Sequence, residues 1–319
     1  MLLDCLFIVV GVVLVLWGAD RLTEGAASMA RRFNVPEIVI GLTIVAAGTS
    51  APELFVSVTS ALQDTPDLAV GNVLGSNIIN TLLIVGVAAM VAPMSISRST
   101  VRKDIPFSVL ASVLLIVLCL DTFDGIDLQG NTISRLDGII LLAGFVLFMV
   151  YTFSVAKKSP AQDASDDKSV IPIWKSLFFV VIGLFCLVVG SDLFVSSASS
   201  VAEHLGVSQS IIGLTIVAGG TSLPELATSV VAAYKGQSAI AIGNVIGSNV
   251  FNILLILGMT AVICPMQIGG ITIVDLSMML LSVVLVWFFS YTRFTVEKWE
   301  GAVLTLSYVA YTGWLLYNI

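Results

Sequence analysis

The sequence predicts an all-α polytopic membrane protein, with ten transmembrane helices arranged as two inverted five-helix repeats and interrupted helices at its functional site. Hydrophobic residues make up 57% of the chain and charged residues only 11%, whereas a soluble domain carries about 25% charged residues. One 46-residue block occurs twice, at 41–86 and 213–258, with 27 identical positions. In each copy one glutamate, Glu53 or Glu225, lies inside an apolar stretch, and acids at such depth mark functional sites in membrane proteins.

Each half of the chain contains five apolar segments long enough to cross a bilayer. The first five are 3–32, 36–62, 68–92, 103–121 and 135–156. The second five are 172–204, 208–234, 240–264, 271–291 and 299–318. We expect four of them to be interrupted helices, because the second and seventh contain proline and the third and eighth contain a Gly-Ser-Asn motif.

The duplication divides the chain into a first repeat (1–156), a cytoplasmic linker (157–171) and a second repeat (172–319). Matching residues outside the repeated block keep the same spacing of 172, as in the pairs Gly11/Gly183 and Gly18/Gly190. Because each repeat has an odd number of spans, the second must enter the membrane upside down relative to the first. This arrangement is typical of secondary transporters, which bind their ligands at the midplane where the repeats meet.

The charges of the loops predict the orientation. If the N-terminus lies outside, all of the 14 Lys and Arg residues except Arg135 face the cytoplasm, as the positive-inside rule requires. The outward loops carry acids instead: Asp64, Asp67, Asp121, Asp124 and Asp127. We therefore expect a multi-pass protein of the cell (inner) membrane with both termini outside. The apolar stretch 2–18 has no basic region before it and belongs to the fold, not to a cleaved signal peptide.

Residues outside the repeated block offer little chemistry. The four cysteines lie singly in apolar stretches without CxxC spacing, so we expect neither a disulfide nor a zinc site. His204 lies near a predicted helix end and is expected at the surface. Asp20 and Asp192, toward the ends of the first spans of their repeats, are expected to be satisfied interfacial carboxylates. No cofactor is expected.

The Gly-Thr-Ser-x-Pro-Glu motif predicts an opened helix beside each glutamate. Pro52 removes a backbone donor and clashes with the preceding turn, so the carbonyls of Ala46 and Thr49 should be freed near Glu53. They would point into the bundle beside the hydroxyls of Thr49 and Ser50, which is tolerable at membrane depth only where they line a cavity or bind something. The second copy supplies the same groups from the opposite side: Ala218, Thr221, Ser222, Pro224 and Glu225.

The Gly-Ser-Asn motifs add a second ring of oxygens. Ser76 and Asn80 lie four residues apart, one helical turn, and so face the same direction. Ser248 and Asn252 repeat this arrangement. Serine offers a hydroxyl and asparagine a neutral carbonyl oxygen, while the glycines of the motifs are expected to allow close helix approach.

Together these residues form a donor set made only of oxygen, which suits hard cations and Ca²⁺ in particular. Two facing carboxylates would repel, and at least one would take a proton unless a cation were bound. One Ca²⁺ or two Na⁺ would neutralise both carboxylates, so the two ions would compete. The alternative is a buried Glu–Glu pair that shares a proton while the serines and asparagines join helices. That alternative does not explain why both copies keep the entire oxygen set.

The repeated motifs also resemble a known family. GLTIVAAGTSAPEL with GNVLGSNIIN, and GLTIVAGGTSLPEL with GNVIGSNVFN, are similar to the α-1 and α-2 repeats of the Ca²⁺/cation antiporter superfamily, in its prokaryotic sodium/calcium exchanger branch. The resemblance implies alternating access and electrogenic exchange of several Na⁺ for one Ca²⁺ at one shared site, without enzymatic chemistry. It implies these ligands: Glu53, Glu225, Asn80, Asn252, Ser50, Ser222, Ser76, Ser248, Thr49, Thr221, Ala46 and Ala218.

Departures from the pattern narrow the choice of ions. Some relatives, including potassium-dependent exchangers, have an aspartate in place of Asn252, so its amide speaks against K⁺ co-transport. The cation/proton branch usually has a glutamate in its GN motif, where this chain has Gly75 and Gly247. A Ca²⁺/H⁺ antiporter of the same fold stays open as the alternative, and a cation channel is a further one. The expected partners are Ca²⁺, Na⁺ and the lipid bilayer, with no nucleic acid and no obligate protein partner.

Overall fold

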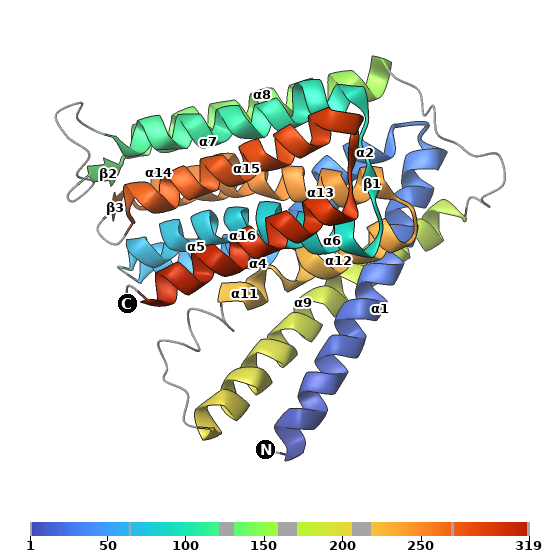
Figure 1. Cartoon of the computed structure of the whole chain (residues 1–319), viewed down its shortest axis with the longest axis horizontal. Coiled ribbons are helices and arrows are strands. Elements are labelled where there is room, and N and C mark those ends of the chain that lie inside the picture. The colour runs from blue at the N-terminus through green and yellow to red at the C-terminus, as the bar shows by residue number, and fades with distance from the viewer. Residues whose placement is uncertain are drawn as a thin grey trace.

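The computed structural model describes residues 2–63, 65–120, 131–158, 171–205, 218–268 and 271–317. Within these ranges the chain is helical, with two short two-stranded sheets (Figure 1). Six of the described helical stretches are long and apolar enough to cross a membrane, and the bent pair Glu37–Thr49 and Ala51–Leu62 is a seventh candidate. The chain is therefore a polytopic helical membrane protein, as its sequence predicts.

The first half of the chain begins with the long helix α1 (Leu2–Arg32). A bent stretch follows, made of α2 (Glu37–Ile40), the π-helical turn η1 (Gly41–Val45), α3 (Ala46–Thr49) and α4 (Ala51–Leu62). The next stretch contains α5 (Pro66–Ile78), the π-helical turn η2 (Ile79–Ile84) and α6 (Val85–Val91). The half ends with η3 (Thr100–Asp104), α7 (Ile105–Cys119) and α8 (Arg135–Lys158).

The second half follows the same order. It contains α9 (Ile173–His204), α11 (Ala218–Thr221) and α12 (Leu223–Tyr234). The next stretch is α13 (Ser238–Val250), the π-helical turn η5 (Phe251–Leu257) and α14 (Gly258–Ile263), and the last helices are α15 (Ile273–Arg293) and α16 (Lys298–Tyr317). The start of the predicted span 208–234, most of the predicted linker 157–171, and the outward acids Asp64, Asp121, Asp124 and Asp127 lie outside the described residues.

Burial separates a central layer from helices that face outward. In the most apolar part of α5–α6 and of α13–α14, 78% of the residues are buried, against 17% in α8. Large apolar side chains on the outer helices are exposed, among them Leu147, Phe185 and Leu306. An apolar exterior is what a lipid solvent requires. The two stretches that carry the Gly-Ser-Asn motifs therefore form the centre of the bundle.

Helices α1 and α9 cross antiparallel and lie along one side of the bundle, with the start of α1 and the end of α9 projecting from it (Figure 1). Their contact is a glycine seam, made of Gly11, Gly18 and Gly25 on α1 and Gly183 and Gly190 on α9. A Cβ atom on Gly18 would lie 2.8 Å from the Gly183 carbonyl oxygen, and one on Gly11 would lie 2.8 Å from that of Gly190. Only hydrogen fits at these positions, so the two backbones touch.

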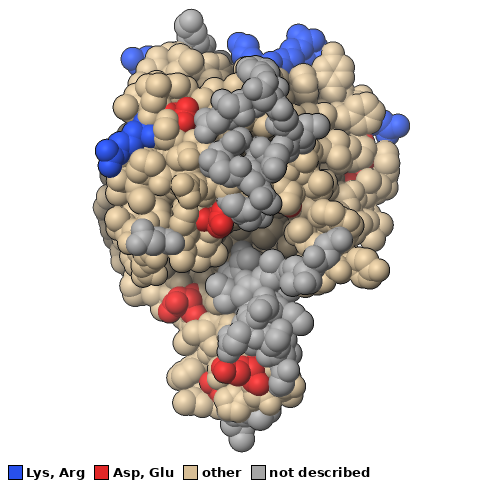
Figure 2. Space-filling view, turned by 90° about the vertical axis from the view of Figure 1, so that its left-hand side faces the viewer, with Lys and Arg blue, Asp and Glu red and all other residues tan. Residues whose placement is uncertain are grey.

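Two strand pairs tie the halves of the chain together. Strand β1 (Met94–Ser95) pairs antiparallel with β4 (Thr295–Val296), and β2 (Asn131–Ile133) pairs with β3 (Met266–Ile268). Strands β1 and β3 are related by the 172-residue spacing, yet they lie at opposite ends of the bundle (Figure 1). The view onto the end that carries β2 and β3 shows acidic side chains across the face, and the basic side chains visible in it lie along the upper edge and the sides of the outline (Figure 2).

Candidate cation site

Each glutamate of the repeated motif lies in the first turn of a helix that starts at a break. Ser50 separates α3 from α4, and the stretch Glu37–Thr49 is bent by 46° relative to α4. Ser222 separates α11 from α12 with nearly the same backbone angles, φ −87° and ψ 5° against φ −83° and ψ 7°. Pro52 and Pro224 lie in the first turn of the following helix, where a missing N–H removes no helical bond. The predicted opening of both helices is confirmed.

The prediction that this opening frees the carbonyl of Ala46 is wrong. That oxygen accepts the backbone N–H of Ser50 at 3.0 Å and the hydroxyl of Thr49 at 3.4 Å. The reason lies in the register of the helical bonds. Pro52 withholds its bond from the residue four positions earlier, Gly48, whereas the ordinary donor to Ala46 is residue 50.

The two carboxylates are buried together and are held by serines from opposite halves of the chain. Neither Glu53 nor Glu225 has any exposed surface (0%). Ser50 donates to Glu225 Oε1 at 3.0 Å, and Ser222 donates to Glu53 Oε1 at 3.5 Å. Ser248 donates to the same Glu225 oxygen at 3.4 Å. The structure therefore brings the two matched acids of the sequence into one buried cluster.

Five buried oxygens of this cluster have no hydrogen-bond partner among the described residues. They are the second oxygen of each carboxylate, the side-chain oxygens of two asparagines and one hydroxyl: Glu53 Oε2, Glu225 Oε2, Asn80 Oδ1, Asn252 Oδ1 and Ser76 Oγ. An unpaired buried acceptor costs about 1–3 kcal/mol, so native proteins seldom keep several together unless something binds there. All five belong to residues that the sequence predicts as ligands.

Asn80 and Asn252 lie on the π-helical turns η2 and η5, not at helix breaks. The stretches 66–91 and 238–263 are continuous, so the prediction that the Gly-Ser-Asn motifs interrupt them is wrong. Glycine and asparagine lower helix propensity without removing the backbone donor, and neither stretch contains proline beyond its first residue. A π-helical turn instead adds one residue to the ladder, as often occurs at functional sites.

Thr49 and Thr221 occupy equivalent positions at the two breaks. Thr49 is fully buried, and its single hydroxyl proton is shared between Oδ1 of Asn244 on α13 at 3.1 Å and the Ala46 carbonyl at 3.4 Å. Thr221 hydrogen-bonds to the carboxylate of Glu53. A hydroxyl that donates one hydrogen bond keeps two lone pairs, so both threonines can also face a cation. Ala218 begins α11, three residues before Thr221.

Sequence reasoning missed a pair of asparagines that brace the glutamate turns. Asn72 donates to Ser57 Oγ at 3.0 Å and to the backbone carbonyl of Glu53 at 3.3 Å. Asn244 makes the equivalent bonds, to Ser229 Oγ at 3.0 Å and to the carbonyl of Glu225 at 3.4 Å. The signal was present, because both asparagines belong to the repeated GNV motif.

A second missed pair, Asn77 and Asn249, joins the two halves. Asn80 donates its Nδ2 to Asn249 Oδ1 at 3.1 Å, and Asn252 donates its Nδ2 to Asn77 Oδ1, also at 3.1 Å. Both missed residues belong to the repeated GSN motif. The sequence shows that each GSN motif is followed by a second asparagine three residues later. It does not show which asparagines of the two halves bond to each other, or which side-chain oxygens stay without a partner.

Asp20 is held by cations away from this cluster. Its carboxylate lies 2.6 Å from Lys235 Nζ and 2.9 Å from the Arg21 guanidinium. Lys235 also donates to the backbone carbonyl of Asp20 at 2.9 Å. The expected satisfied carboxylate is therefore confirmed at Asp20, while Asp192 and His204 are exposed on α9.

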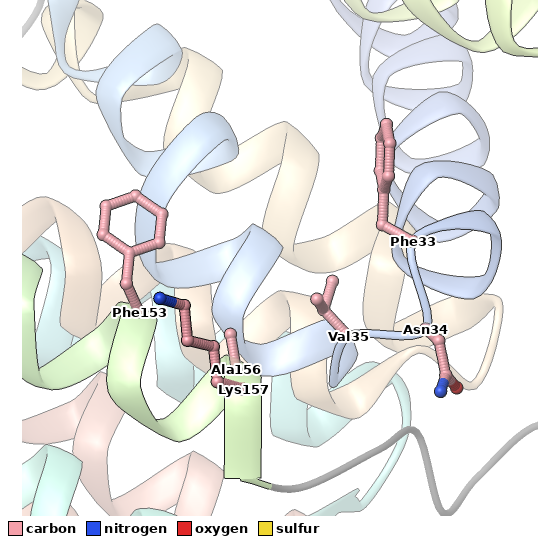
Figure 3. Close-up of a pocket in the computed structure, with 6 residues that line it drawn as sticks. All are labelled: Phe33, Asn34, Val35, Phe153, Ala156 and Lys157. Atoms are coloured by element: carbon pink, nitrogen blue, oxygen red, sulfur yellow. The ribbon is translucent and has the colours of Figure 1, made fainter.

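A surface pocket of about 560 Å³ lies between the turn that follows α1 and the last turns of α8 (Figure 3). It is lined by Phe33, Asn34, Val35, Phe153, Ala156 and Lys157. None of the predicted ligands lines it. The candidate site is therefore defined by the buried oxygens and not by this pocket.

The chain is similar over most or all of its length to other membrane proteins, among them named sodium/calcium exchangers. It is 38% identical to the inner membrane protein YrbG of Escherichia coli over 290 residues, which cover 88% of this chain and 86% of that protein. It is 32% identical to the sodium/calcium exchanger MaX1 of Methanosarcina acetivorans over 344 residues, which cover 98% of each chain. A structure of the sodium-calcium exchanger NCX_Mj matches with a TM-score of 0.82 and 30% identity, covering 97% of both chains.

The family comparison covers both halves of the molecule. Residues 4–154 and 175–317 match the sodium/calcium exchanger protein family, and these ranges include both glutamates and both Gly-Ser-Asn motifs. Together with the full-length similarity to MaX1, this match shows that the chain belongs to the sodium/calcium exchanger family of the Ca²⁺/cation antiporter superfamily.

Proposed function

We propose that this chain is a secondary active antiporter, not an enzyme, that exchanges Na⁺ for Ca²⁺ by alternating access. The observation that carries the proposal is the set of five unpaired buried oxygens around Glu53 and Glu225. Oxygen donors in a flexible, irregular arrangement match the coordination of Ca²⁺, and the same hard donors accept Na⁺. Membership of the exchanger family supports the same conclusion.

The proposed ligands combine charged and neutral oxygens from both halves of the chain. The side-chain donors are Glu53, Glu225, Asn80, Asn252, Ser50, Ser222, Ser76, Ser248, Thr49 and Thr221. The carbonyls of Ala46 and Ala218 complete the set. At Ala46 a cation would displace one of the two hydrogen bonds that the oxygen now accepts. The serine hydroxyls that now donate to the carboxylates would turn their lone pairs toward the cation.

Charge provides the basis for exchange. Two ionised carboxylates give the site a charge of −2, and a buried charge of this size is costly unless cations balance it. One Ca²⁺ or two Na⁺ would balance it, and a third Na⁺ would leave a net charge of +1. Ca²⁺ and Na⁺ together would overcharge the site, so binding of one ion favours release of the other.

We further propose ten spans in two inverted repeats, 1–156 and 172–319, joined by a cytoplasmic linker at 157–171, with both termini outside the inner membrane. The antiparallel crossing of α1 and α9 supports the inversion. So does the location of β1 and β3, related strands that lie at opposite ends of the bundle (Figure 1). The similarity to the inner membrane protein YrbG supports the location.

In the proposed cycle, α1 and α9 slide against the other helices and open the site to one side at a time. The glycine seam supports their movement as one body, because their backbones are in contact. Projection of the start of α1 and the end of α9 beyond the bundle is consistent with this role (Figure 1).

A flux assay tests the proposal directly. Purified protein in proteoliposomes is expected to take up ⁴⁵Ca²⁺ when an outward Na⁺ gradient is imposed, and not when only a pH gradient is imposed. Uptake driven by the pH gradient alone would instead identify a Ca²⁺/H⁺ antiporter of the same fold. Uptake without any counter-ion would identify a channel. Addition of K⁺ is expected to change nothing.

A further inference from the structure

The asparagines of the two GSNxxN segments form two crossed pairs between the halves of the chain. Asn80 on η2 donates to Asn249 on α13, and Asn252 on η5 donates to Asn77 on α5, each at 3.1 Å. All four side chains are at most 2% exposed. The two bonds are equivalent under the 172-residue repeat, so the arrangement occurs twice in one site.

A side-chain amide has a donor end and an acceptor end, and it serves a cation only when its oxygen faces that cation. In both crossed pairs the bonded end of Asn80 or Asn252 is Nδ2, and the end without a partner is Oδ1. If either amide turned over, its oxygen would lie against the partner's oxygen and its NH₂ group would take the place of the ligand oxygen. The crossed bond therefore selects the orientation that binds a cation.

We propose that Asn77 and Asn249 are positioning residues, which hold the amides of Asn252 and Asn80 with their oxygens toward the transported cation. This inference rests on the proposed function, which supplies the cation. Asn77 is itself oriented, because its Nδ2 donates to the backbone carbonyl of Asn249 at 3.5 Å and contacts Met279 Sδ on α15 at 4.0 Å. Its Oδ1 is thereby left to face Asn252.

This role differs from that of a residue that only joins helices. A carboxylate has two equivalent oxygens, so an aspartate in place of Asn80 presents an oxygen to the cation whichever way it turns. In the otherwise wild-type chain, Asn249→Leu should raise the Kd for Ca²⁺ by about tenfold, the effect of losing one hydrogen bond. In the Asn80→Asp background, the same substitution should change the Kd by no more than about twofold.

The matched control is the Asn252→Asp background. It adds the same charge at the equivalent position of the other half, but Asn252 is oriented by Asn77 and not by Asn249. In the Asn252→Asp background, Asn249→Leu should still raise the Kd for Ca²⁺ about tenfold, because the amide of Asn80 still depends on Asn249 for its orientation. Asn77→Leu should behave in the equivalent way. It should raise the Kd for Ca²⁺ about tenfold in the wild-type and Asn80→Asp backgrounds, and by no more than about twofold in the Asn252→Asp background.

Calorimetric Ca²⁺ binding to the purified full chain gives the Kd, and the KM for Ca²⁺ in Na⁺-driven uptake gives an independent value. An equal loss in all three backgrounds would overturn the positioning role and leave a packing role. If Asn249→Leu does not fold, the Asn77→Leu series decides by the same criterion, and failure of both variants to fold also overturns the proposal. A wild-type chain that does not bind Ca²⁺ would overturn the proposed function itself.

Discussion

At the scale of single residues, the two buried carboxylates are alike in burial but not in hydrogen bonding. Glu225 accepts hydroxyls from Ser50 at 3.0 Å and Ser248 at 3.4 Å, whereas the Ser222 bond to Glu53 is longer, at 3.5 Å. Each carboxylate nevertheless keeps one oxygen without a partner. A cation that satisfies both must therefore lie between residues from the two halves of the chain.

Removal of either charge should abolish exchange. Glu53→Gln and Glu225→Gln keep the side-chain size but leave a site of charge −1, which cannot balance Ca²⁺. Loss of one partner of a buried ion pair costs about 3–5 kcal/mol, so Na⁺-driven ⁴⁵Ca²⁺ uptake should fall at least about 100-fold. Both variants should still elute as folded protein in gel filtration.

Glu300 provides a matched control for these two variants. It is a buried glutamate (2% exposed) on α16, and it accepts the backbone N–H of Glu297 at 2.8 Å. The amide oxygen of a glutamine can accept the same bond, so Glu300→Gln should leave uptake unchanged. Wild-type uptake by Glu53→Gln or Glu225→Gln would remove these residues from the site.

Asn252→Asp should make transport more sensitive to pH. It places a third carboxyl group in the same buried site, where protons and cations compete for it. Because the protonated form binds no cation, uptake should fall as the pH is lowered from about 8 to about 6, and more steeply than in the wild type. Initial ⁴⁵Ca²⁺ uptake rates at a fixed Na⁺ gradient measure this profile. Asn34 is exposed, so the control variant Asn34→Asp should keep the pH profile of the wild type. If Asn252→Asp also kept the wild-type pH profile, the proposed buried surroundings of Asn252 would be contradicted.

The glutamates, serines and two of the asparagines that the structure brings together in the candidate site were named from the sequence, but their mutual bonds could not be predicted. Duplication and residue type identified the glutamates, serines and asparagines, because an all-oxygen set repeated at one register is rare in apolar segments. Spacing along a helix predicts the face of the helix on which a side chain lies. It does not predict whether the oxygen or the nitrogen of a side-chain amide makes the hydrogen bond. The braces made by Asn72 and Asn244 therefore became visible only in three dimensions.

At the scale of helices, proline was a reliable signal and the Gly-Ser-Asn motif was not. Pro52 and Pro224 do follow breaks at Ser50 and Ser222, because proline cannot donate the helical bond. The stretches with the Gly-Ser-Asn motif stay continuous and widen into η2 and η5. A π-helical turn forms where backbone N–H groups bond to the carbonyl five residues earlier instead of four. The hydropathy of the side chains does not predict this change of register.

A methyl group in the glycine seam should loosen α1 from α9. A Cβ atom on Gly18 would lie 2.8 Å from the Gly183 carbonyl oxygen and 3.0 Å from the Leu187 backbone nitrogen. Backbone atoms cannot turn aside, so Gly18→Ala should lower the free energy of unfolding by about 1–3 kcal/mol. Thermal unfolding in detergent should show the loss as a lower Tm.

Gly313 on α16 is the matched control for the seam. A Cβ atom there meets nothing within 4 Å, so Gly313→Ala should stabilise the helix by about 0.5–1 kcal/mol. The two substitutions are thus expected to shift the Tm in opposite directions. Equal shifts would show that the seam is no tighter than an ordinary helix surface.

At the scale of the whole molecule, the proposed topology can be tested by labelling. In a background without the native cysteines, Tyr317→Cys places a thiol at the end of α16, where Tyr317 is 89% exposed. Lys157→Cys places one at the end of α8. A membrane-impermeant maleimide added to intact cells should label the first variant and not the second. The reverse pattern would overturn the orientation of both repeats.

The class of the fold could be predicted from the sequence because lipid imposes a simple rule: apolar segments of sufficient length become helices. The helices α1, α8, α9 and α15 begin and end close to the predicted limits. The strand pairs that join β1 to β4 and β2 to β3 were not predicted, because strands of two or three residues have no periodicity. Each pair joins a strand of the first half to a strand of the second half, so the pairing depends on how the helices pack and not on local sequence.

The contact between α1 and α9 has a consequence for leakage. In the proposed cycle, two antiparallel helices that touch along their backbones would move together as one body. A movement of this pair that opened the site to one aqueous compartment would then cover it on the side of the other. A continuous water path would be prevented by the shape of the moving part itself, whether or not an ion occupied the protein at that moment.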